Sequence, residues 1–379
     1  MHRQHAGRPI ALSPEPSSPS AHEHLCCEIL VTGLCNMGCD YCVATDLPKV
    51  TMTAEVGRKA IDLFVDLAAG GKSIEFVFTG GEPFMASGLL GDMTRYARYR
   101  TLDAGMLPSF VVKTNGTLLT SRAIEYLKLN EAKVVVSIDG MSSTHDKHRL
   151  NQKQGCTHAK VVGNLYKALQ NEINCSVSVT VHPDASSQVL ENVRYLHGLG
   201  IEQLSVGPAY GTVRWSVDQI AGLSASLLDV ARFMRDVRHT AGSLEVGPLY
   251  KESEHVAGKL SGIWGCNAAS TNLAFLPDGK IAGCSALGML TIKFPELVLG
   301  DVFEGLNQEV TDRMVRLAQA DAADRPKCQS CETAENCAGG CLAFDYATSA
   351  SPFTPPRVYC NTIATIPVAC DLAWGTGKD

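Results

Sequence analysis

Short apolar runs alternate with stretches of helical periodicity through the first 240 residues of the chain. The expected strands cover residues 26–32, 73–79, 109–113, 133–138, 174–181 and 203–206. The expected helices cover residues 53–69, 87–103, 121–129, 158–171, 187–199 and 216–239. Strands that are joined through helices pair in parallel, with right-handed crossovers. Six such units, rather than eight, predict an α/β fold built on an incomplete, TIM-like (β/α)6 barrel.

Polar sequences follow several of these expected strands. In barrels of this kind, functional residues gather at the carboxyl ends of the strands. Two adjacent glycines let a backbone approach a ligand closely, and a neighbouring carboxylate suits an ammonium group. The alternative interpretation of these residues is a simple turn, or a carboxylate at the start of a helix. The strand-end sequences in question are Thr79-Gly80-Gly81-Glu82-Pro83, Lys113-Thr114-Asn115-Gly116 and Ser137-Ile138-Asp139-Gly140.

Three cysteines, Cys35, Cys39 and Cys42, follow the first expected strand with the spacing Cys-x3-Cys-x2-Cys. One loop at a strand end can turn all three thiols inward. Three thiolates can hold three irons of a 4Fe-4S cube and leave the fourth iron open, which a catalytic cluster needs. A zinc site is the structural alternative, but structural zinc sites usually close with four ligands. We therefore expect these cysteines to be catalytic cluster ligands.

The triplet, with Tyr41 before its last cysteine, resembles the cluster motif of radical S-adenosylmethionine (SAM) enzymes. In that family the amine and carboxylate of SAM chelate the fourth iron. One electron from the reduced cluster cleaves SAM, and the 5'-deoxyadenosyl radical abstracts a substrate hydrogen. The resemblance implies that the Gly-Gly-Glu-Pro element contacts the methionyl amine, and that two other strand ends lie near the ribose and carboxylate. The implied SAM-binding residues are Tyr41, Gly80, Gly81, Glu82, Asn115 and Ser137.

A charged segment, His145-Asp146-Lys147-His148-Arg149, follows the fourth expected strand in what reads as a long polar loop. It resembles the His-Asp-x-x-Arg segment that is frequent in radical SAM enzymes that modify peptides. Its mixed charges could grip a peptide. A solvated charged face is the alternative interpretation.

Seven of the 15 cysteines form a trailing group. Clustered cysteines in a reducing compartment are typical metal ligands. The residues 273–276 and 280–284, around Pro277-Asp278-Gly279, predict a β-hairpin, and the residues 306–320 predict a helix. The order of the cysteines resembles the SPASM extension of many peptide-modifying radical SAM enzymes. The trailing cysteines are Cys266, Cys284, Cys328, Cys331, Cys337, Cys341 and Cys360.

This resemblance implies two auxiliary 4Fe-4S clusters in addition to the SAM-binding one, with two structural zinc ions as the alternative. One cluster would take Cys328, Cys331, Cys337 and Cys360, and the other would take Cys266, Cys284 and Cys341. The second set lacks a fourth cysteine. We expect an open iron there, with Cys370, a substrate cysteine or Asp345 as alternatives.

The chain is expected to divide into four parts. Residues 1–22, rich in Pro, Ser and His, predict a poorly ordered tail. The barrel is expected over residues 23–240, a linker over 241–265, and the SPASM domain over 266–379.

The net charge of −6 gives no general attraction to nucleic acid or to anionic membranes, so neither is expected as a partner. The sequence contains no apolar run of about 18 residues, and its first residues lack the hydrophobic core of a signal peptide. A cytoplasmic location is therefore expected.

The leading hypothesis is a radical SAM/SPASM maturase that installs a C–C or thioether crosslink, or a related oxidative change, in a ribosomally made precursor peptide. Its expected partners are that peptide and an electron donor such as flavodoxin or ferredoxin. The alternatives are a sulfatase-maturing oxidase and a small-molecule dehydrogenase or epimerase. In sulfatase-maturing enzymes an Asp acts as base after the cysteine at this position, whereas Ser285 follows Cys284 here. A non-enzymatic iron-sulfur redox protein would leave the Gly-Gly-Glu-Pro element unexplained.

Overall fold

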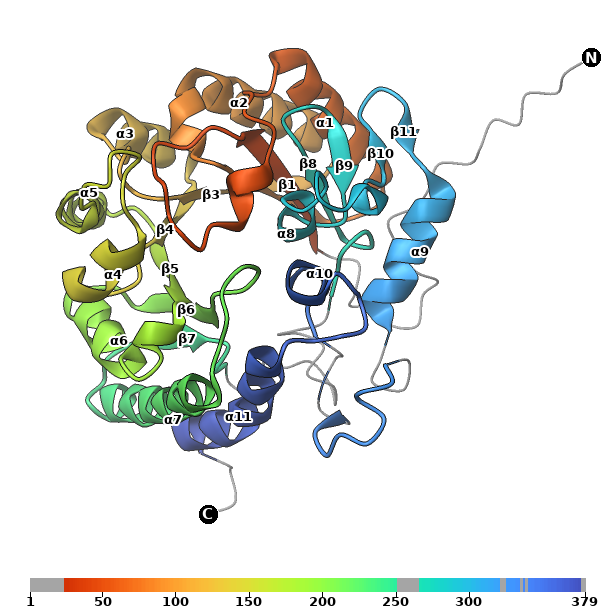
Figure 1. The fold of residues 1–379 in the computed structure, drawn as a ribbon. Helices are drawn as coiled ribbons and strands as arrows, with labels where there is room; N and C mark the ends of the chain where they lie inside the picture. The colour runs from red at the N-terminus through yellow and green to blue at the C-terminus, as the bar shows by residue number, and fades with distance from the viewer. Residues whose placement is uncertain (1–23, 251–265, 321–324, 335–336, 338–339, 376–379) are drawn as a thin grey trace, which may run out of the picture.

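The computed structural model describes residues 24–250, 266–320, 325–334, 337 and 340–375 (Figure 1). The tail predicted over residues 1–22 lies outside the described residues, as do residues 251–265 of the predicted linker. Among the described helices, none is both long and apolar enough to cross a membrane.

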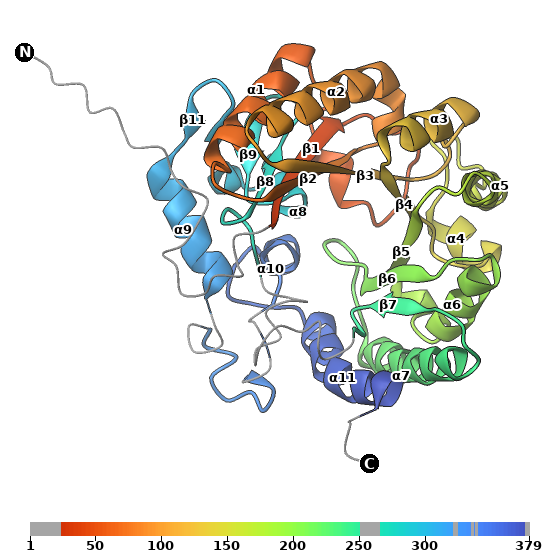
Figure 2. The same ribbon diagram turned by 180° about the vertical axis from the view of Figure 1, so that it is seen from behind.

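The barrel strands follow one another in the sheet in chain order, and each pairs in parallel with the next. The sheet curves strongly without closing, so the predicted incomplete barrel is confirmed (Figures 1 and 2). The strands are β1 (His24–Thr32), β2 (Ser73–Gly80), β3 (Leu107–Thr114), β4 (Lys133–Ser137), β5 (Cys175–Val181), β6 (Gln203–Pro208) and β7 (Glu245–Gly247).

Helices cover the outer face of this curved sheet (Figure 1). Their apolar stripes face the sheet; on α1, for example, Ala60, Ile61 and Phe64 are fully buried. Thr53 caps α1 by accepting a hydrogen bond from the Val56 amide, which fixes the start of that helix. The helices are α1 (Ala54–Leu67), α2 (Ser87–Asp103), α3 (Ser121–Asn130), α4 (Ser142–His148), α5 (His158–Gln170), α6 (Val189–Gly198) and α7 (Val217–His239).

Two elements differ from the sequence prediction. Strand β7 lies in the range predicted as a linker, and its three residues are too few to show a period. Helix α4 replaces the predicted polar loop at residues 145–149. His145, His148 and Arg149 are buried, so the solvated-face interpretation of this segment is wrong.

The C-terminal region continues the barrel sheet rather than forming a sheet of its own. Strand β8 (Asn272–Phe275) pairs in parallel with β1, and the predicted hairpin to β9 (Lys280–Ala282) is confirmed. The short strands β10 (Gly300–Asp301) and β11 (Gly305–Leu306) extend the same edge. In the described part of the chain, the sheet therefore has eleven strands, with β11 at one edge and β7 at the other.

Among the C-terminal helices, all but α9 lie along the open side of the barrel (Figures 1 and 2). Helix α11 packs against α7, next to the β7 edge, while α8 follows the hairpin at the β1 edge, and α10 lies between these two regions (Figures 1 and 2). Of the trailing cysteines, Cys284 and Cys341 precede α8 and α10, and Cys360 lies in α11. These helices are α8 (Ser285–Gly288), α9 (Gln308–Gln319), α10 (Leu342–Ser349) and α11 (Arg357–Trp374).

Candidate active site

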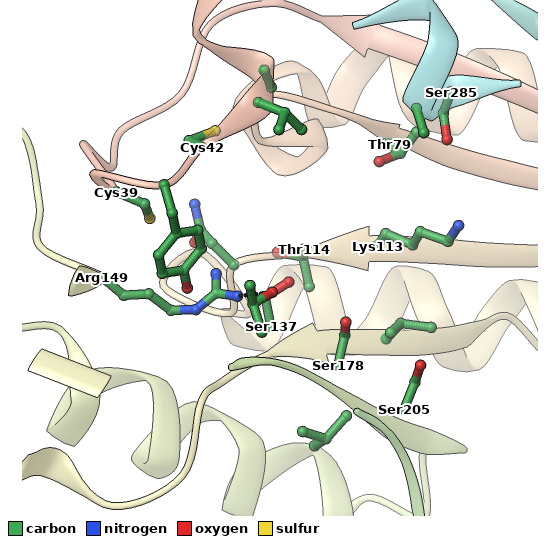
Figure 3. A pocket seen from close by; sticks show the side chains of 18 of the residues that line it. Cys39, Cys42, Thr79, Lys113, Thr114, Ser137, Arg149, Ser178, Ser205 and Ser285 are labelled. Carbon is green, nitrogen blue, oxygen red and sulfur yellow. Dashed lines mark hydrogen bonds between the residues drawn. The ribbon is translucent and has the colours of Figure 1, made fainter. Parts of the chain in front are cut away.

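A cavity of about 740 Å³ lies inside the curved sheet. The cysteine loop after β1 forms one wall, and the ends and inner faces of β2 to β6 form the others. Figure 3 shows side chains from several strands converging on this space. Nine residues were predicted to bind the cluster or SAM at this end of the barrel. All of them except Glu82 line the cavity: Cys35, Cys39, Cys42, Tyr41, Gly80, Gly81, Asn115 and Ser137.

The three thiols of the loop lie close enough to influence one another. Burial raises the pKa of Cys39 to about 12, and Cys42 and Cys35 raise it further while Arg149 lowers it. Burial also raises the pKa of Cys35, with Cys42 among the neighbours that add to this effect. Several thiolates in so buried a place require a positive partner. The donor set therefore fits a metal cluster.

The glycines after β2 are needed to bring this strand against the cysteine loop. A side-chain Cβ at Gly80, whose φ is +122°, would lie 2.4 Å from the carbonyl oxygen of Thr32, and one at Gly81 would lie 2.1 Å from that of Leu34. The Gly81 amide donates to the Thr32 carbonyl at 2.7 Å. Any larger residue would push the loop away.

Glu82 lies behind the cavity wall and is fully buried. Its carboxylate accepts hydrogen bonds from Thr114 Oγ1 at 2.8 Å, the Asn115 amide at 2.8 Å and the Phe84 amide at 3.1 Å. Burial raises the pKa of Glu82 to about 7, although these donors lower it. In this placement the carboxylate oxygens join the ends of β2 and β3, and the predicted contact with the methionyl amine stays a prediction.

Asn115 and Ser137 stand at the ends of β3 and β4 and face the cavity. The Asn115 amide group donates to Asn36 Oδ1 at 2.9 Å, and its nitrogen lies 3.7 Å from Cys35 Sγ. Asn115 therefore ties the end of β3 to the cysteine loop. Its predicted contact with SAM, and that of Ser137, stay predictions.

Tyr41 is fixed by a buried ion pair. Its hydroxyl donates to Asp139, which also accepts from Arg149 Nε at 2.9 Å and from the Thr180 amide at 2.9 Å. The Arg149 guanidinium lies 5.4 Å from the centre of the Tyr41 ring. The ring can therefore hold one orientation at the cavity wall. The role of Arg149 escaped the sequence prediction, although the charged segment that contains it had been noted.

The inner faces of β5 and β6 are polar. In β5 the valines Val177, Val179 and Val181 are buried, while the alternate residues Ser176, Ser178 and Thr180 line the cavity. Strand β6 repeats this pattern with Gln203 and Ser205 facing inward. Side chains of alternating strand residues point to opposite faces. The cavity therefore offers several hydroxyl groups to a polar substrate (Figure 3).

A buried carboxylate lies next to Ser285, the residue after Cys284. Ser285 Oγ donates to Glu28 Oε1 at 2.8 Å, and Lys113 Nζ lies 3.5 Å from the same oxygen. Burial raises the pKa of Glu28, but Lys113 and the donors of Ser285 outweigh burial and hold it below its usual value. Ser285 and Lys113 both line the cavity. This group could not be predicted from local sequence patterns, because Glu28 and Ser285 are 257 residues apart.

The trailing cysteines form two neighbouring groups in the structure. Burial raises the pKa of Cys284 strongly, and Cys266 and Cys341 add to the rise. Burial likewise raises the pKa of Cys360 to about 11, with further contributions from its neighbours Cys328, Cys337 and Cys331. The members of each predicted ligand set therefore lie together.

Asp345, on α10, lies one helical turn after Cys341 and is fully buried. Its Oδ2 accepts a hydrogen bond from Arg325 at 2.8 Å, while its Oδ1 has no partner among the described residues. Asp345 also raises the pKa of both Cys266 and Cys341, so its carboxylate lies near these thiols.

Comparison with known proteins agrees with this geometry. Residues 29–196 match the profile of the radical SAM superfamily. A serine-type anaerobic sulfatase-maturating enzyme of Klebsiella aerogenes is 24% identical over 353 residues, which cover 88% of this chain and 83% of that enzyme. An uncharacterized protein of Methanocaldococcus jannaschii is 26% identical over 175 residues, and this match spans 46% of this chain and 59% of that protein.

Solved structures share the fold. Native anSMEcpe with bound AdoMet has a TM-score of 0.76 at 17% identity, over 92% of this chain and 99% of that one. Streptococcus suis SuiB bound to S-adenosylmethionine has a TM-score of 0.64 at 15% identity, over 89% of this chain and 77% of that one. The profile match shows that residues 29–196 form a radical SAM domain, and the domains of that superfamily use S-adenosylmethionine and a 4Fe-4S cluster.

Proposed function

We propose that this enzyme is a maturase that abstracts a hydrogen atom from a ribosomally made precursor peptide and installs a C–C or thioether crosslink or a related oxidative change. The observation that carries the proposal is the single cavity that joins the three-thiol loop to the polar inner faces of β5 and β6. The fold is shared with anSMEcpe bound to AdoMet and the Kp18Cys peptide, and with SuiB bound to its precursor peptide SuiA, which supports a peptide substrate.

In this proposal, SAM and its cluster supply the 5'-deoxyadenosyl radical, and the chain binds and orients them. Cys35, Cys39 and Cys42 hold the cluster. Gly80 and Gly81 present backbone to SAM at the cavity wall, and Tyr41, Asn115 and Ser137 complete the SAM-binding residues. Glu82 acts indirectly by keeping the ends of β2 and β3 in register. An external donor such as flavodoxin or ferredoxin would deliver the electron.

The proposal includes two auxiliary 4Fe-4S clusters in the C-terminal region. The proximity of the thiols within each set supports the ligand sets Cys328, Cys331, Cys337 and Cys360, and Cys266, Cys284 and Cys341. Arg325 and Asp345 affect thiols of both sets. Among the protein groups considered for the fourth position of the second set, Asp345 has the strongest support, because its Oδ1 is buried without a partner in the described structure.

Sulfatase maturation is the second candidate, and the match to the Klebsiella aerogenes enzyme over most of both chains favours it. In sulfatase-maturing enzymes the Asp that acts as base follows this cysteine. Here Ser285 follows Cys284, and a serine hydroxyl cannot replace a carboxylate base. Glu28 supplies a carboxylate behind that hydroxyl, and Lys113 supplies an amine beside it. A reaction of this type would need one of these groups to accept the proton.

Mass spectrometry distinguishes the two candidates. The anaerobically reconstituted enzyme would be incubated with SAM and dithionite, and with either a short precursor peptide encoded beside its gene or a sulfatase-derived peptide containing Ser or Cys. Maturation of the precursor predicts a product two hydrogens lighter, with a linkage that survives fragmentation. An aldehyde that reacts with a hydrazide, formed only in the sulfatase peptide, would favour the second candidate. Formation of 5'-deoxyadenosine without change in either peptide would contradict both.

A further inference from the structure

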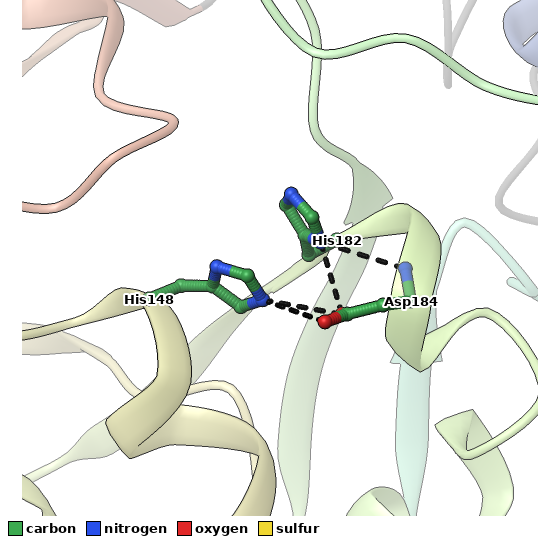
Figure 4. Close-up of side chains that lie close together, drawn as sticks. All are labelled: His148, His182 and Asp184. Atoms are coloured by element: carbon green, nitrogen blue, oxygen red, sulfur yellow. Dashed lines mark hydrogen bonds and ion pairs between the residues drawn. The ribbon is translucent and has the colours of Figure 1, made fainter.

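We propose that His148, His182 and Asp184 form a binding site for a divalent transition-metal ion, separate from all the cysteine groups. His148 Nε2 lies 3.1 Å from Asp184 Oδ1, and His182 Nδ1 lies 2.9 Å from the same oxygen. One ligand atom from each residue lies within 4.8 Å of the other two. Figure 4 shows both rings turned toward the carboxylate.

Three segments that are distant in sequence build this site. His148 is the last residue of α4, and His182 and Asp184 flank Pro183 after the end of β5. Asp40 reaches the group from the cysteine loop. The site therefore lies at the carboxyl end of the barrel, where the loops around the active site meet.

In metal-binding histidines, the ring nitrogen that does not bind the metal usually donates a hydrogen bond to a carboxylate or a carbonyl group. Asp40 is in position to accept such a bond from His148. Its Oδ2 lies 2.8 Å from His148 Nδ1, the ring nitrogen that does not face Asp184. A carboxylate on one nitrogen fixes the tautomer and directs the lone pair of the other nitrogen toward a metal. In a neutral His148 whose Nδ1–H donates to Asp40, the Nε2 lone pair faces the Asp184 carboxylate.

His182 is in a similar position. Its Nδ1 lies against the Asp184 carboxylate, and the Asp184 backbone amide lies 3.4 Å from the same nitrogen, a long contact that a metal ion on this nitrogen would replace. The two imidazole rings stack with their centres 3.7 Å apart. A cation bound between the two nitrogens and the carboxylate oxygen satisfies all three lone pairs.

The ligand types indicate which ions can bind. Two imidazoles and one carboxylate suit Zn²⁺ and its first-row neighbours, and leave a coordination position open. The ligand atoms of a tetrahedral zinc site lie about 3.3 Å apart, close to the two nitrogen–oxygen distances in this structure. An adjoining cavity of about 380 Å³, lined by His182, Asp184 and Arg214, gives access from solvent. The bound ion would connect the cysteine loop, through Asp40, to the end of β5.

Zinc binding to the iron-sulfur-reconstituted enzyme tests this proposal. The holoenzyme would be treated with a chelator, mixed with Zn²⁺ and dialysed, and its zinc and iron contents would be measured together. We expect about one zinc per chain in the wild type, with bond lengths of about 2.0–2.1 Å to nitrogen and oxygen in X-ray absorption. His182→Ala and Asp184→Asn should lose this zinc and retain their iron, which shows that they remain folded. Asp40→Ala should weaken zinc binding about 10- to 100-fold.

His197→Ala is the matched control, because His197 is a half-buried histidine on α6, away from the site, and should leave zinc binding unchanged. Added Zn²⁺ should raise the Tm of the wild type and of this control, but not that of His182→Ala. The proposal is overturned by a wild type without zinc after dialysis, or by zinc–sulfur distances of about 2.3 Å. Zinc that persists in both His182→Ala and Asp184→Asn would also overturn it. In those cases the hydrogen bonds that join His148 to Asp40 and Asp184 explain the cluster without a metal ion.

Discussion

Buried charged side chains hold the strand ends of the active site in place. Glu82 joins β2 to β3, Asp139 positions Tyr41, and Glu28 joins β1 to Ser285. Each accepts several hydrogen bonds in an environment that is nearly free of water. Removing one member of such a buried network leaves a partner unsatisfied, which usually costs more than a surface change.

Glu82→Gln tests this structural role. The new amide group presents N–H donors to the Thr114 hydroxyl or the Asn115 amide, where the carboxylate accepted hydrogen bonds. We expect a loss of about 1–3 kcal/mol in the free energy of unfolding, together with slower 5'-deoxyadenosine formation. Glu55→Gln, at an exposed position in the first turn of α1, is the control. Unchanged stability with weaker SAM binding would instead restore the direct contact with SAM.

His145 makes stability depend on pH. Burial, followed by Arg149, lowers its pKa from 6.5 to about 4, so the unfolded chain binds the proton more tightly than the folded chain. The contribution of His145 is fully present above pH 6.5 and is lost as the pH falls toward 4. Between these two pH values, the free energy of unfolding measured with denaturant should change less with pH in His145→Gln than in the wild type. Equal slopes would refute the assignment, and the exposed His239→Gln controls for the loss of a histidine.

At the scale of elements, local sequence patterns were enough to predict the main helices and strands of the barrel. The helix predicted over residues 87–103 matches α2, and the predicted hairpin matches β8 and β9, because periodicity and turn residues act over a few positions. Helix α4 was not predicted, since its charged residues are buried by partners from other segments, such as Asp139 and Asp184. The pairing of β8 with β1 likewise depends on contacts that no local pattern encodes.

Helix α10 provides the test of the fourth cluster position, because it presents Cys341 and Asp345 one turn apart. If Asp345 is the ligand, Asp345→Cys should keep the iron of that cluster, and Asp345→Ala should change its EPR spectrum. Asp345→Ala also leaves Arg325 buried without its partner, with an expected cost of about 3–5 kcal/mol. The spectra would be recorded with Cys35, Cys39 and Cys42 replaced by Ala.

Asp312→Ala, on the exposed face of α9, is the matched control for the removal of a carboxylate. An Asp345→Ala spectrum identical to that of the parent would exclude Asp345 as ligand. A spectrum that responds to an added thiol in the parent protein would indicate the open iron that the sequence predicts.

At the scale of the whole molecule, the C-terminal region and the barrel form one continuous sheet. Strand β8 lies beside β1, and α11 packs against α7. The resemblance carried by the cysteine spacing predicted two ligand sets, and thiols within each set affect one another's pKa. The sequence could not predict the internal partners of Glu82 or the Glu28–Ser285 contact, which depend on the assembled fold.

The iron content tests this assembly. Three 4Fe-4S clusters require about twelve iron atoms per chain after anaerobic reconstitution. Replacing Cys35, Cys39 and Cys42 together by Ala should remove about four of them. Iron near eight in the wild type, with zinc in the remaining cysteine site, would show that one cysteine set holds zinc instead.

The most direct test of the central claim is SAM cleavage. With SAM and dithionite, the reconstituted enzyme should release 5'-deoxyadenosine slowly without substrate, because the proposed cluster ligands and the proposed SAM-binding residues line one cavity. Cys39→Ala should abolish this release, and Cys156→Ala, at an exposed cysteine away from the cavity, should retain it. Release that is absent from the wild type, or equal in Cys39→Ala, would contradict the assignment of this loop as the site of radical formation.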